Sequence, residues 1–230
     1  AADGRAPGRA GLVSVGGAIT LTDLGDVPDV DALLGLTALN NELTISGLSA
    51  LSDLDGVSNV TSTSGVYFYI EGNDALSNVS GLAGVTEADA LYLSSLPSLT
   101  SLSGLENLSS VDRHLSLSNL DALVTVDSLG SLTEVGGKLY VQNNNTLQDV
   151  NGLTALETVG DFVRVQNNYD LLDLNGLSAL TTIGGDLTVD ANSDLTDVTG
   201  LHNVSSVDGD VAITDNTSMS MRLNSSKHDH

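Results

Sequence analysis

Apolar residues recur along the chain in pairs that are two positions apart, such as Leu139 and Val141. Alternation with a period of two is typical of a β-strand that has one buried face. The chain therefore predicts one short strand in each repeat. The equivalent pairs are spaced 23 to 25 residues apart, at Ile19/Leu21, Leu43/Ile45, Phe68/Ile70, Leu91/Leu93, Leu115/Leu117, Val163/Val165, Leu187/Val189 and Val211/Ile213.

The rest of each repeat lacks helical spacing. One repeat reads GLTALETVGDFVRVQNNYDLLDLN, and Gly, Asn and Asp interrupt every copy. No segment keeps the helical period over the roughly ten residues that a helix needs. Repeats of this length bury their apolar side chains by stacking on one another. We predict an all-β, right-handed β-solenoid of nine coils of about 24 residues, forming a single domain at 11–216 between tails at 1–10 and 217–230.

Glycine and asparagine recur at fixed places around the predicted strand. Glycines precede it, where positive φ or close approach between coils is expected, at Gly16, Gly17, Gly136, Gly137, Gly160, Gly184, Gly185 and Gly209. Asparagines follow the first strand position by five residues, at Asn73, Asn144, Asn168, Asn192 and Asn216. An inward asparagine there is expected to bond the turn backbone and stack on its equivalents.

The repeat pattern L-x-x-L-x-G-L-x-x-L-x-x-V-G-G-x-L-x-V-x-x-N resembles the receptor L domain, the leucine-rich, β-helix-like module of growth-factor receptor ectodomains and of many microbial cell-surface proteins. The resemblance covers residues 12 to 216. It implies an extracellular or cell-surface location and a non-enzymatic role in recognition or adhesion. Receptor L domains typically carry cysteines and a capping helix, and neither is evident in this sequence, so receptor function itself is not implied.

Alternation along the strands also predicts an outer face. If Leu139 and Val141 point inward, their neighbours Lys138 and Tyr140 point outward. Exposed clusters of Tyr, Phe and Arg are typical of interaction surfaces, and we expect a glycan or protein ligand here. Aromatic residues also favour strands and stack for stability, which is the alternative explanation. The candidate binding residues are Tyr67, Tyr69, Tyr92, His114, Lys138, Tyr140, Phe162 and Arg164, with Arg113 beside His114.

The charge balance limits what this face can bind. The chain has 30 acidic and 7 basic residues, for a net charge of −23. Such a surface repels nucleic acid and anionic membranes, and no apolar run is long enough to span a bilayer. Neither nucleic-acid binding nor membrane insertion is expected. No cofactor is expected, although calcium on Asp-rich turns is an alternative to a solvated acidic edge for the column Asp53, Asp149, Asp173 and Asp197.

Groups for catalysis or metal binding are few. The chain has no cysteine and four histidines, of which only His228 and His230 have ligand-like spacing. No G-x-S-x-G motif is present. We expect no enzyme activity, although paired carboxylates alone can cleave polysaccharides.

The ends of a solenoid expose its core unless another element covers them. The periodicity runs from Leu12 to Asn216, with no amphipathic helix outside it. The alternative function is therefore a structural subunit of an extracellular filament that self-associates head to tail. Its contacts would be Leu12, Val15, Ile19 and Leu21 at one end and Val204, Val207, Val211 and Ile213 at the other.

Overall fold

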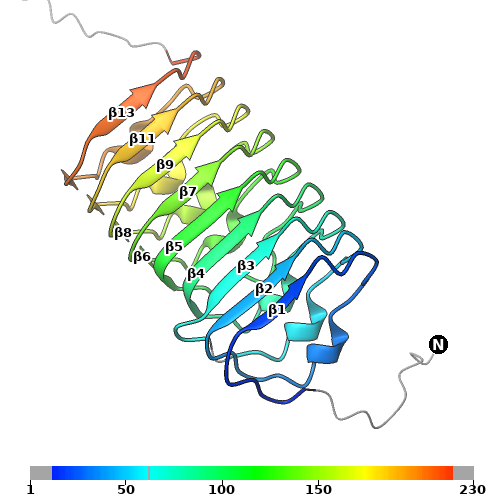
Figure 1. Ribbon diagram of the computed structural model, residues 1–230. Helices are drawn as coiled ribbons and strands as arrows, with labels where there is room; N and C mark the ends of the chain where they lie inside the picture. Colours follow the sequence, from blue (N-terminus) through cyan, green and yellow to red (C-terminus); the bar gives the residue numbers. More distant parts are fainter. Residues whose placement is uncertain (1–11, 62, 220–230) are drawn as a thin grey trace, which may run out of the picture.

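The repeated apolar pairs lie on neighbouring strands of one long sheet. The computed structural model describes residues 12–61 and 63–219. The strands pair in parallel with their apolar positions in register, so that Leu139 is opposite Leu115 and Val163, and Figure 1 shows them side by side. The predicted all-β, solenoid-like architecture is confirmed. The strands are β1 (Ile19–Thr22), β2 (Glu42–Ser46), β3 (Tyr67–Glu71), β4 (Glu87–Ser94), β5 (Ser110–Ser118), β7 (Leu139–Gln142), β9 (Val163–Gln166), β11 (Leu187–Asp190) and β13 (Val211–Thr214).

A second row of shorter strands lies beside the first in the C-terminal part. The start of β5 pairs with β6 and its end pairs with β7, so this long strand joins the two rows. From β6 onward, each coil bends between a two-residue strand and a four-residue strand. The short strands are β6 (Glu134–Val135), β8 (Thr158–Val159), β10 (Thr182–Ile183) and β12 (Ser206–Val207).

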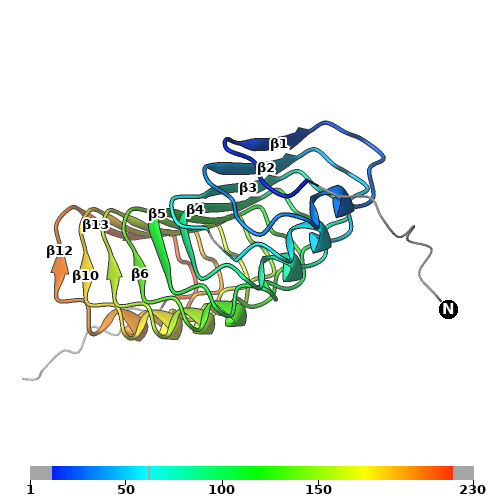
Figure 2. The ribbon, with the colours of Figure 1, turned by 90° about the horizontal axis from the view of Figure 1, so that it is seen from below.

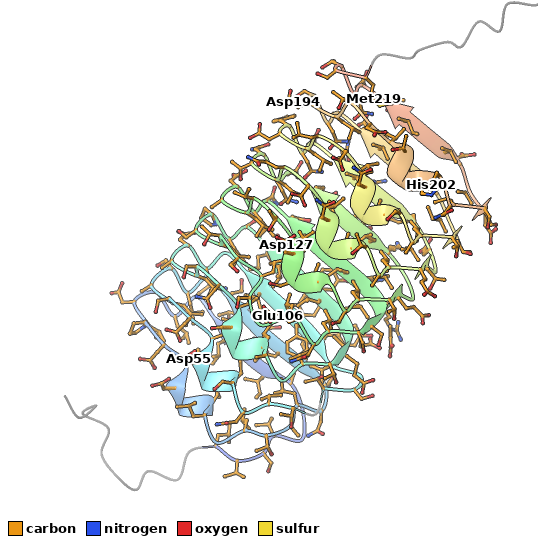
Figure 3. All side chains as sticks on the ribbon, turned by 180° about the vertical axis from the view of Figure 1, so that it is seen from behind. Asp55, Glu106, Asp127, Asp194, His202 and Met219 are labelled. Carbon is orange, nitrogen blue, oxygen red and sulfur yellow. The ribbon has the colours of Figure 1, made fainter. Side chains whose placement is uncertain are left out.

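Three-residue 3-10 helices cover the opposite side of the coils, toward the viewer in Figure 3. They form two rows with different directions, which Figure 2 shows in blue to cyan and in green to orange. We call η1–η3 with β1–β3 the N-terminal stack, and η4–η7 with β6–β13 the C-terminal stack. The helices are η1 (Asp31–Leu33), η2 (Asp55–Val57), η3 (Ser80–Leu82), η4 (Asp127–Leu129), η5 (Asn151–Leu153), η6 (Asn175–Leu177) and η7 (Thr199–Leu201).

The coil between the two stacks has a different turn in place of a 3-10 helix. Gly104 has a φ of 111°, and its N–H donates to Glu106 Oε2 at 2.8 Å. Ser128 of η4 donates to the other oxygen of this carboxylate at 3.2 Å. Burial would raise the pKa of Glu106, but hydrogen bonds from backbone N–H groups and hydroxyls lower it. Figure 3 shows Glu106 on the helix-bearing side, between Asp55 and Asp127. Its carboxylate therefore joins this irregular turn to the C-terminal stack.

Glycine sets the distance between successive 3-10 helices. A Cβ on Gly152, at the centre of η5, would lie 1.8 Å from the carbonyl oxygen of Val126 in the preceding coil. The central residue is also glycine in η2, η3, η6 and η7. The first helix of each stack has Ala32 or Ser128 instead, because no 3-10 helix of the described chain lies directly before it in its row. The sequence therefore marks the start of each row, because the central residue of its first 3-10 helix is not glycine.

Inward leucine, valine and isoleucine side chains form one continuous core. Buried asparagines run along one edge of it. Asn168 is fully buried; its Oδ1 accepts a hydrogen bond from the Asn144 N–H (3.1 Å) and its Nδ2 donates to the Val141 carbonyl (2.9 Å). The same bonds continue through Asn192 and Asn216. The predicted stacking of inward asparagines is confirmed.

The prediction of positive φ or close approach between coils is confirmed as close approach for the glycines from Gly136 onward and is wrong for Gly16 and Gly17. Gly136, Gly160 and Gly184 do not have positive φ. These glycines allow the backbones of neighbouring coils to lie close together, because a Cβ on Gly160 would lie 2.1 Å from the Gly136 carbonyl oxygen. Gly16 and Gly17 have no such neighbour within 4 Å. Positive φ occurs instead directly after the strand, at Asp23, Gly47, Gly72, Ser95, Asn119, Asn143, Asn167, Ala191 and Asp215.

Candidate binding surface

Six of the eight candidate binding residues lie in strands of the main sheet, and Lys138 and Phe162 directly precede β7 and β9. Glu42, Tyr67 and Ala90 are cross-strand partners in one column, and Tyr92, Ser116 and Tyr140 are partners in the next. All eight candidate residues are half-buried, so each keeps part of its side chain exposed. The predicted outward columns are therefore present in the structure.

Three tyrosines form the first group on this face. The rings of Tyr69 and Tyr92 stack with centroids 4.7 Å apart and planes 5° apart. Tyr67 is parallel to Tyr69 at 6.3 Å, and His114 meets Tyr92 edge-on at 6.4 Å. We call Tyr67, Tyr69, Tyr92 and His114 the tyrosine cluster. Since Tyr69 and Tyr92 stack on each other, those ring faces are not open to a ligand, and the cluster offers mainly ring edges and hydroxyls.

An ion pair lies beside the tyrosine cluster. Arg113 Nε is 3.0 Å from Asp89 Oδ2, and its guanidinium lies 5.9 Å from the Tyr67 ring centroid. A hydrogen bond with Asp89 raises the pKa of Tyr67, and burial raises the pKa of Tyr69 and Tyr92. All three phenols are therefore neutral at physiological pH, where they can both donate and accept hydrogen bonds.

Phe162 is the centre of the second group. Its ring meets Tyr140 edge-on, with centroids 4.9 Å apart and planes at 88°. Lys138 Nζ lies 4.8 Å and Arg164 Cζ lies 5.2 Å from the Phe162 centroid, within the range of cation–π attraction. Lys138 Nζ is also 4.0 Å from Asp161 Oδ2. We call Lys138, Tyr140, Phe162 and Arg164 the phenylalanine cluster.

The single patch expected from the sequence is thus divided into two clusters. Ser116 separates Tyr92 from Tyr140 in their column. One direct link remains, since the Lys138 N–H donates to His114 Nδ1 at 3.1 Å. An extended ligand could touch both clusters only by crossing the small Ser116 side chain.

Asp89 is the residue of this face that sequence reasoning missed. It lies where β5 has one extra residue relative to β4, between the pairs Ala88/Val111 and Ala90/His114. This bulge also places Arg113. The apolar pairs of β4 and β5 keep the 24-residue spacing, so no change in that spacing marks the bulge in the sequence.

The predicted acidic column has a structural role in the backbone. Asp149 Oδ1 accepts a hydrogen bond from the Asn151 N–H at 2.9 Å, and Asp53, Asp173 and Asp197 make the equivalent bond. The bonds from Thr199 lower the pKa of Asp197. Over residues 12–61 and 63–219, no three His, Cys, Asp or Glu side chains gather as metal ligands. His228 and His230 lie outside the described residues, as do residues 1–10 of the predicted tail.

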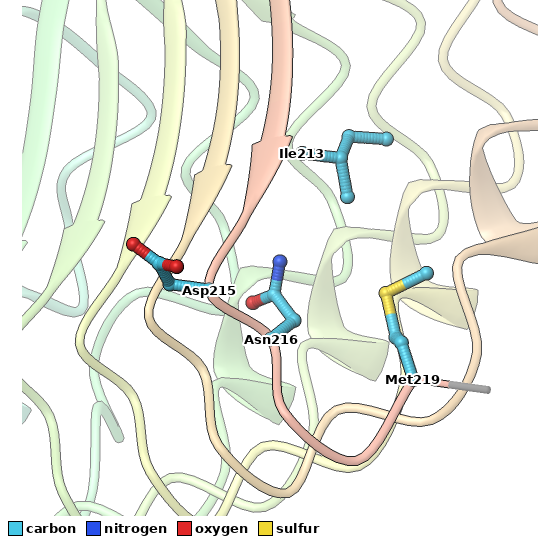
Figure 4. A pocket seen from close by; sticks show the side chains of 4 residues that line it. All are labelled: Ile213, Asp215, Asn216 and Met219. Atoms are coloured by element: carbon cyan, nitrogen blue, oxygen red, sulfur yellow. The ribbon is translucent and has the colours of Figure 1, made fainter. Parts of the chain in front are cut away.

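The ends of the described solenoid expose several of the predicted apolar residues. Val211 is 57% and Ile213 is 37% exposed in β13, and Leu12 is 45% exposed at the other end. Ile19 was expected at that end but is only 7% exposed, because it packs into the core. Ile213 and Met219 line a shallow hollow at the end of the stack, with Asp215 and Asn216 beside them (Figure 4).

Comparisons with known proteins give no family for this chain. No family model and no curated protein matches it. Among solved structures, an internalin from Listeria monocytogenes aligns over 88% of this chain and 85% of its own, with 16% identity and a TM-score of 0.29. A TM-score this low supports no argument about function. No helix in the described part of the chain is long and apolar enough to cross a membrane.

Proposed function

We propose that this protein is a non-enzymatic recognition or adhesion module that works outside the cell or at its surface. In this proposal, a right-handed solenoid of nine coils serves as a rigid rod. The tyrosine and phenylalanine clusters on its main sheet bind a glycan or a protein ligand.

The observation that supports this proposal is the concentration of aromatic and basic side chains on one face of a strongly acidic chain. The chain has five tyrosines and two phenylalanines, and five of these seven aromatic residues lie on this face. Arg113, Lys138 and Arg164 lie there as well. Stacking between coils explains aromatic pairs, but it gives no reason for basic residues to share their face. Half-exposed aromatic and arginine side chains are the residues that contribute most to binding at interfaces.

A glycan array and a cell-surface binding assay would test this proposal with Tyr140→Ala and Arg164→Ala. Each variant should bind at least about tenfold more weakly, in keeping with the loss of a central contact. Tyr169→Ala is the matched control, since Tyr169 is 48% exposed but is not one of the cluster residues. Unchanged binding by both cluster variants would exclude this face as the binding surface.

A second candidate function is head-to-tail self-association, which the exposure of Val211 and Ile213 favours. Burial of apolar side chains would drive it, while repulsion between subunits of charge −23 would oppose it. Assembly should therefore increase with salt, and calcium should increase it further if it neutralises the acidic surface. Sedimentation with and without salt and calcium measures this. A monomer under every condition, or an assembly that Ile213→Asp leaves unchanged, would exclude this candidate.

A further inference from the structure

Arg164 differs from the other two basic residues of the binding face. Arg113 pairs with Asp89 at 3.0 Å, and Lys138 has Asp161 at 4.0 Å. Within residues 12–61 and 63–219, no carboxylate lies within ion-pair distance of Arg164, and its buried Nε has no hydrogen-bond partner. The other N–H groups of its guanidinium also have no acceptor among the described residues, so a ligand that supplies an acceptor to these groups would be favoured.

The surroundings of Arg164 keep it unpaired. Its cross-strand partners are Tyr140 and Thr188, which are uncharged. Two acidic residues, Asp186 and Asp190, lie two positions to either side of Thr188. Asp190 accepts hydrogen bonds from Gln166 Nε2 and Thr214 Oγ1, and Asp186 Oδ1 accepts one from the Asp210 N–H. The guanidinium is held in place by the Phe162 ring, 5.2 Å away. This is a positioned cation with free donors in a chain that has 30 acidic residues.

Building on the proposed recognition function, we propose that Arg164 is an anion subsite that binds the carboxylate or sulfate group of a linear acidic polysaccharide. The planar guanidinium can donate two parallel hydrogen bonds to either group. Lys138, on the same Phe162 ring, supplies a second positive charge one coil away.

The geometry of the face favours a polysaccharide over an acidic protein. An acidic protein presents a broad surface and would also meet Asp161, Asp186 and Asp190, which repel it. A single polysaccharide chain is narrow enough to follow the columns of the face. The column of Lys138 and Phe162 continues with Asp186 and Asp210 on the next coils, so the attraction for acidic groups is confined to Lys138 and Arg164.

Binding of immobilised polygalacturonate, dextran sulfate, neutral dextran and poly-glutamate at physiological salt tests this inference. The first two probes separate a carboxylate from a sulfate ligand. Wild type should bind at least one of them and should not bind neutral dextran. Arg164→Gln should weaken that binding at least about tenfold, as expected for the loss of charge-assisted hydrogen bonds. Tyr169→Glu is the matched control, because it lowers the net charge by the same one unit at an exposed residue that belongs to neither cluster.

Several results would overturn the subsite. Equal losses for Arg164→Gln and Tyr169→Glu would show attraction by general charge only. Binding of poly-glutamate as tight as that of the acidic polysaccharides, or no binding of either polysaccharide, would exclude the ligand class. A ligand that depends on Tyr140 but not on Arg164 would remove the subsite and leave the proposed function standing. Circular dichroism and the thermal midpoint of each variant show that the fold is retained.

Discussion

In the N-terminal part of the molecule the outward strand positions carry stacked tyrosines, whereas in the C-terminal stack the inward turn positions carry stacked asparagines. The tyrosines lie on β3 and β4. Leu48 and Leu96 occupy the asparagine position in the coils of β2 and β4, whereas the coil of β3 has Asn73 there. From Asn144 onward every coil has an asparagine there.

The difference shows that one coil geometry can be held in two ways. Tyrosine stacking is apolar and lies on the surface, so those residues remain accessible to a ligand. The asparagines satisfy buried backbone groups, and Asn144, Asn168 and Asn192 have no exposed surface with which to bind a ligand. The asparagine row therefore contributes to stability, and the outer face is left for recognition.

Gly152→Ala should have the largest effect on stability. The new Cβ would overlap the Val126 carbonyl oxygen, so neighbouring coils must separate. We expect the free energy of unfolding to fall by about 3 kcal/mol or more. Denaturant titration measures this. Gly130→Ala is the control from the same stack, because its Cβ would lie 3.6 Å from the Asp127 carbonyl oxygen, an ordinary contact distance. The free energy of unfolding of this variant should change by less than about 1 kcal/mol. Similar losses in both variants would contradict the role of glycine in coil spacing.

Asn168→Leu makes a C-terminal coil resemble the coils with Leu48 and Leu96. It removes the partners of the Asn144 N–H and the Val141 carbonyl, which are buried. The expected loss is about 2 to 3 kcal/mol, measured as the change in free energy of unfolding. Asn175→Leu, at an exposed position of η6, should change stability by only about 0.5 kcal/mol. A fully stable Asn168→Leu protein would mean that the asparagine row is dispensable.

Ala191→Gly should have the smallest effect, and it should be stabilising. Ala191 has a φ of 54°, while the same position after the strand is Gly47 or Gly72 in the N-terminal stack. Glycine relieves the strain of the left-handed conformation, so we expect the free energy of unfolding to rise by about 1 kcal/mol. Thermal or chemical unfolding measures this. Ala155→Gly, where φ is not positive, should instead lower stability. A loss in both variants would contradict the strain at Ala191.

The sequence predicted the parts of the fold that depend on periodicity. The pairs such as Leu139 and Val141 predicted the strands, and the same alternation predicted the outer face with Tyr140 and Arg164. The asparagine row followed from the need to satisfy buried turns. Each of these predictions rests on a rule that repeats from coil to coil.

Features that occur once were not predictable in this way. The division into two stacks depends on how Glu106 folds back onto Gly104, and the Arg113–Asp89 pair depends on a single bulge. Positive φ after the strand was not predicted, because most of these positions carry asparagine, serine, aspartate or alanine, and only two of them carry glycine. The separation of the binding face into two clusters depends on Ser116, which the columns alone did not indicate as a boundary.

The constant spacing in the C-terminal stack has a consequence for how such a protein can evolve. The first inward residue of each strand lies 24 residues after that of the preceding strand, at Leu115, Leu139, Val163, Leu187 and Val211. Duplication or loss of a gene segment that encodes one coil would preserve the reading frame and the cross-strand partners of every other coil. Unequal recombination could thus lengthen or shorten this half of the rod in whole steps. The junction at Glu106, which occurs once, would not tolerate the same exchange.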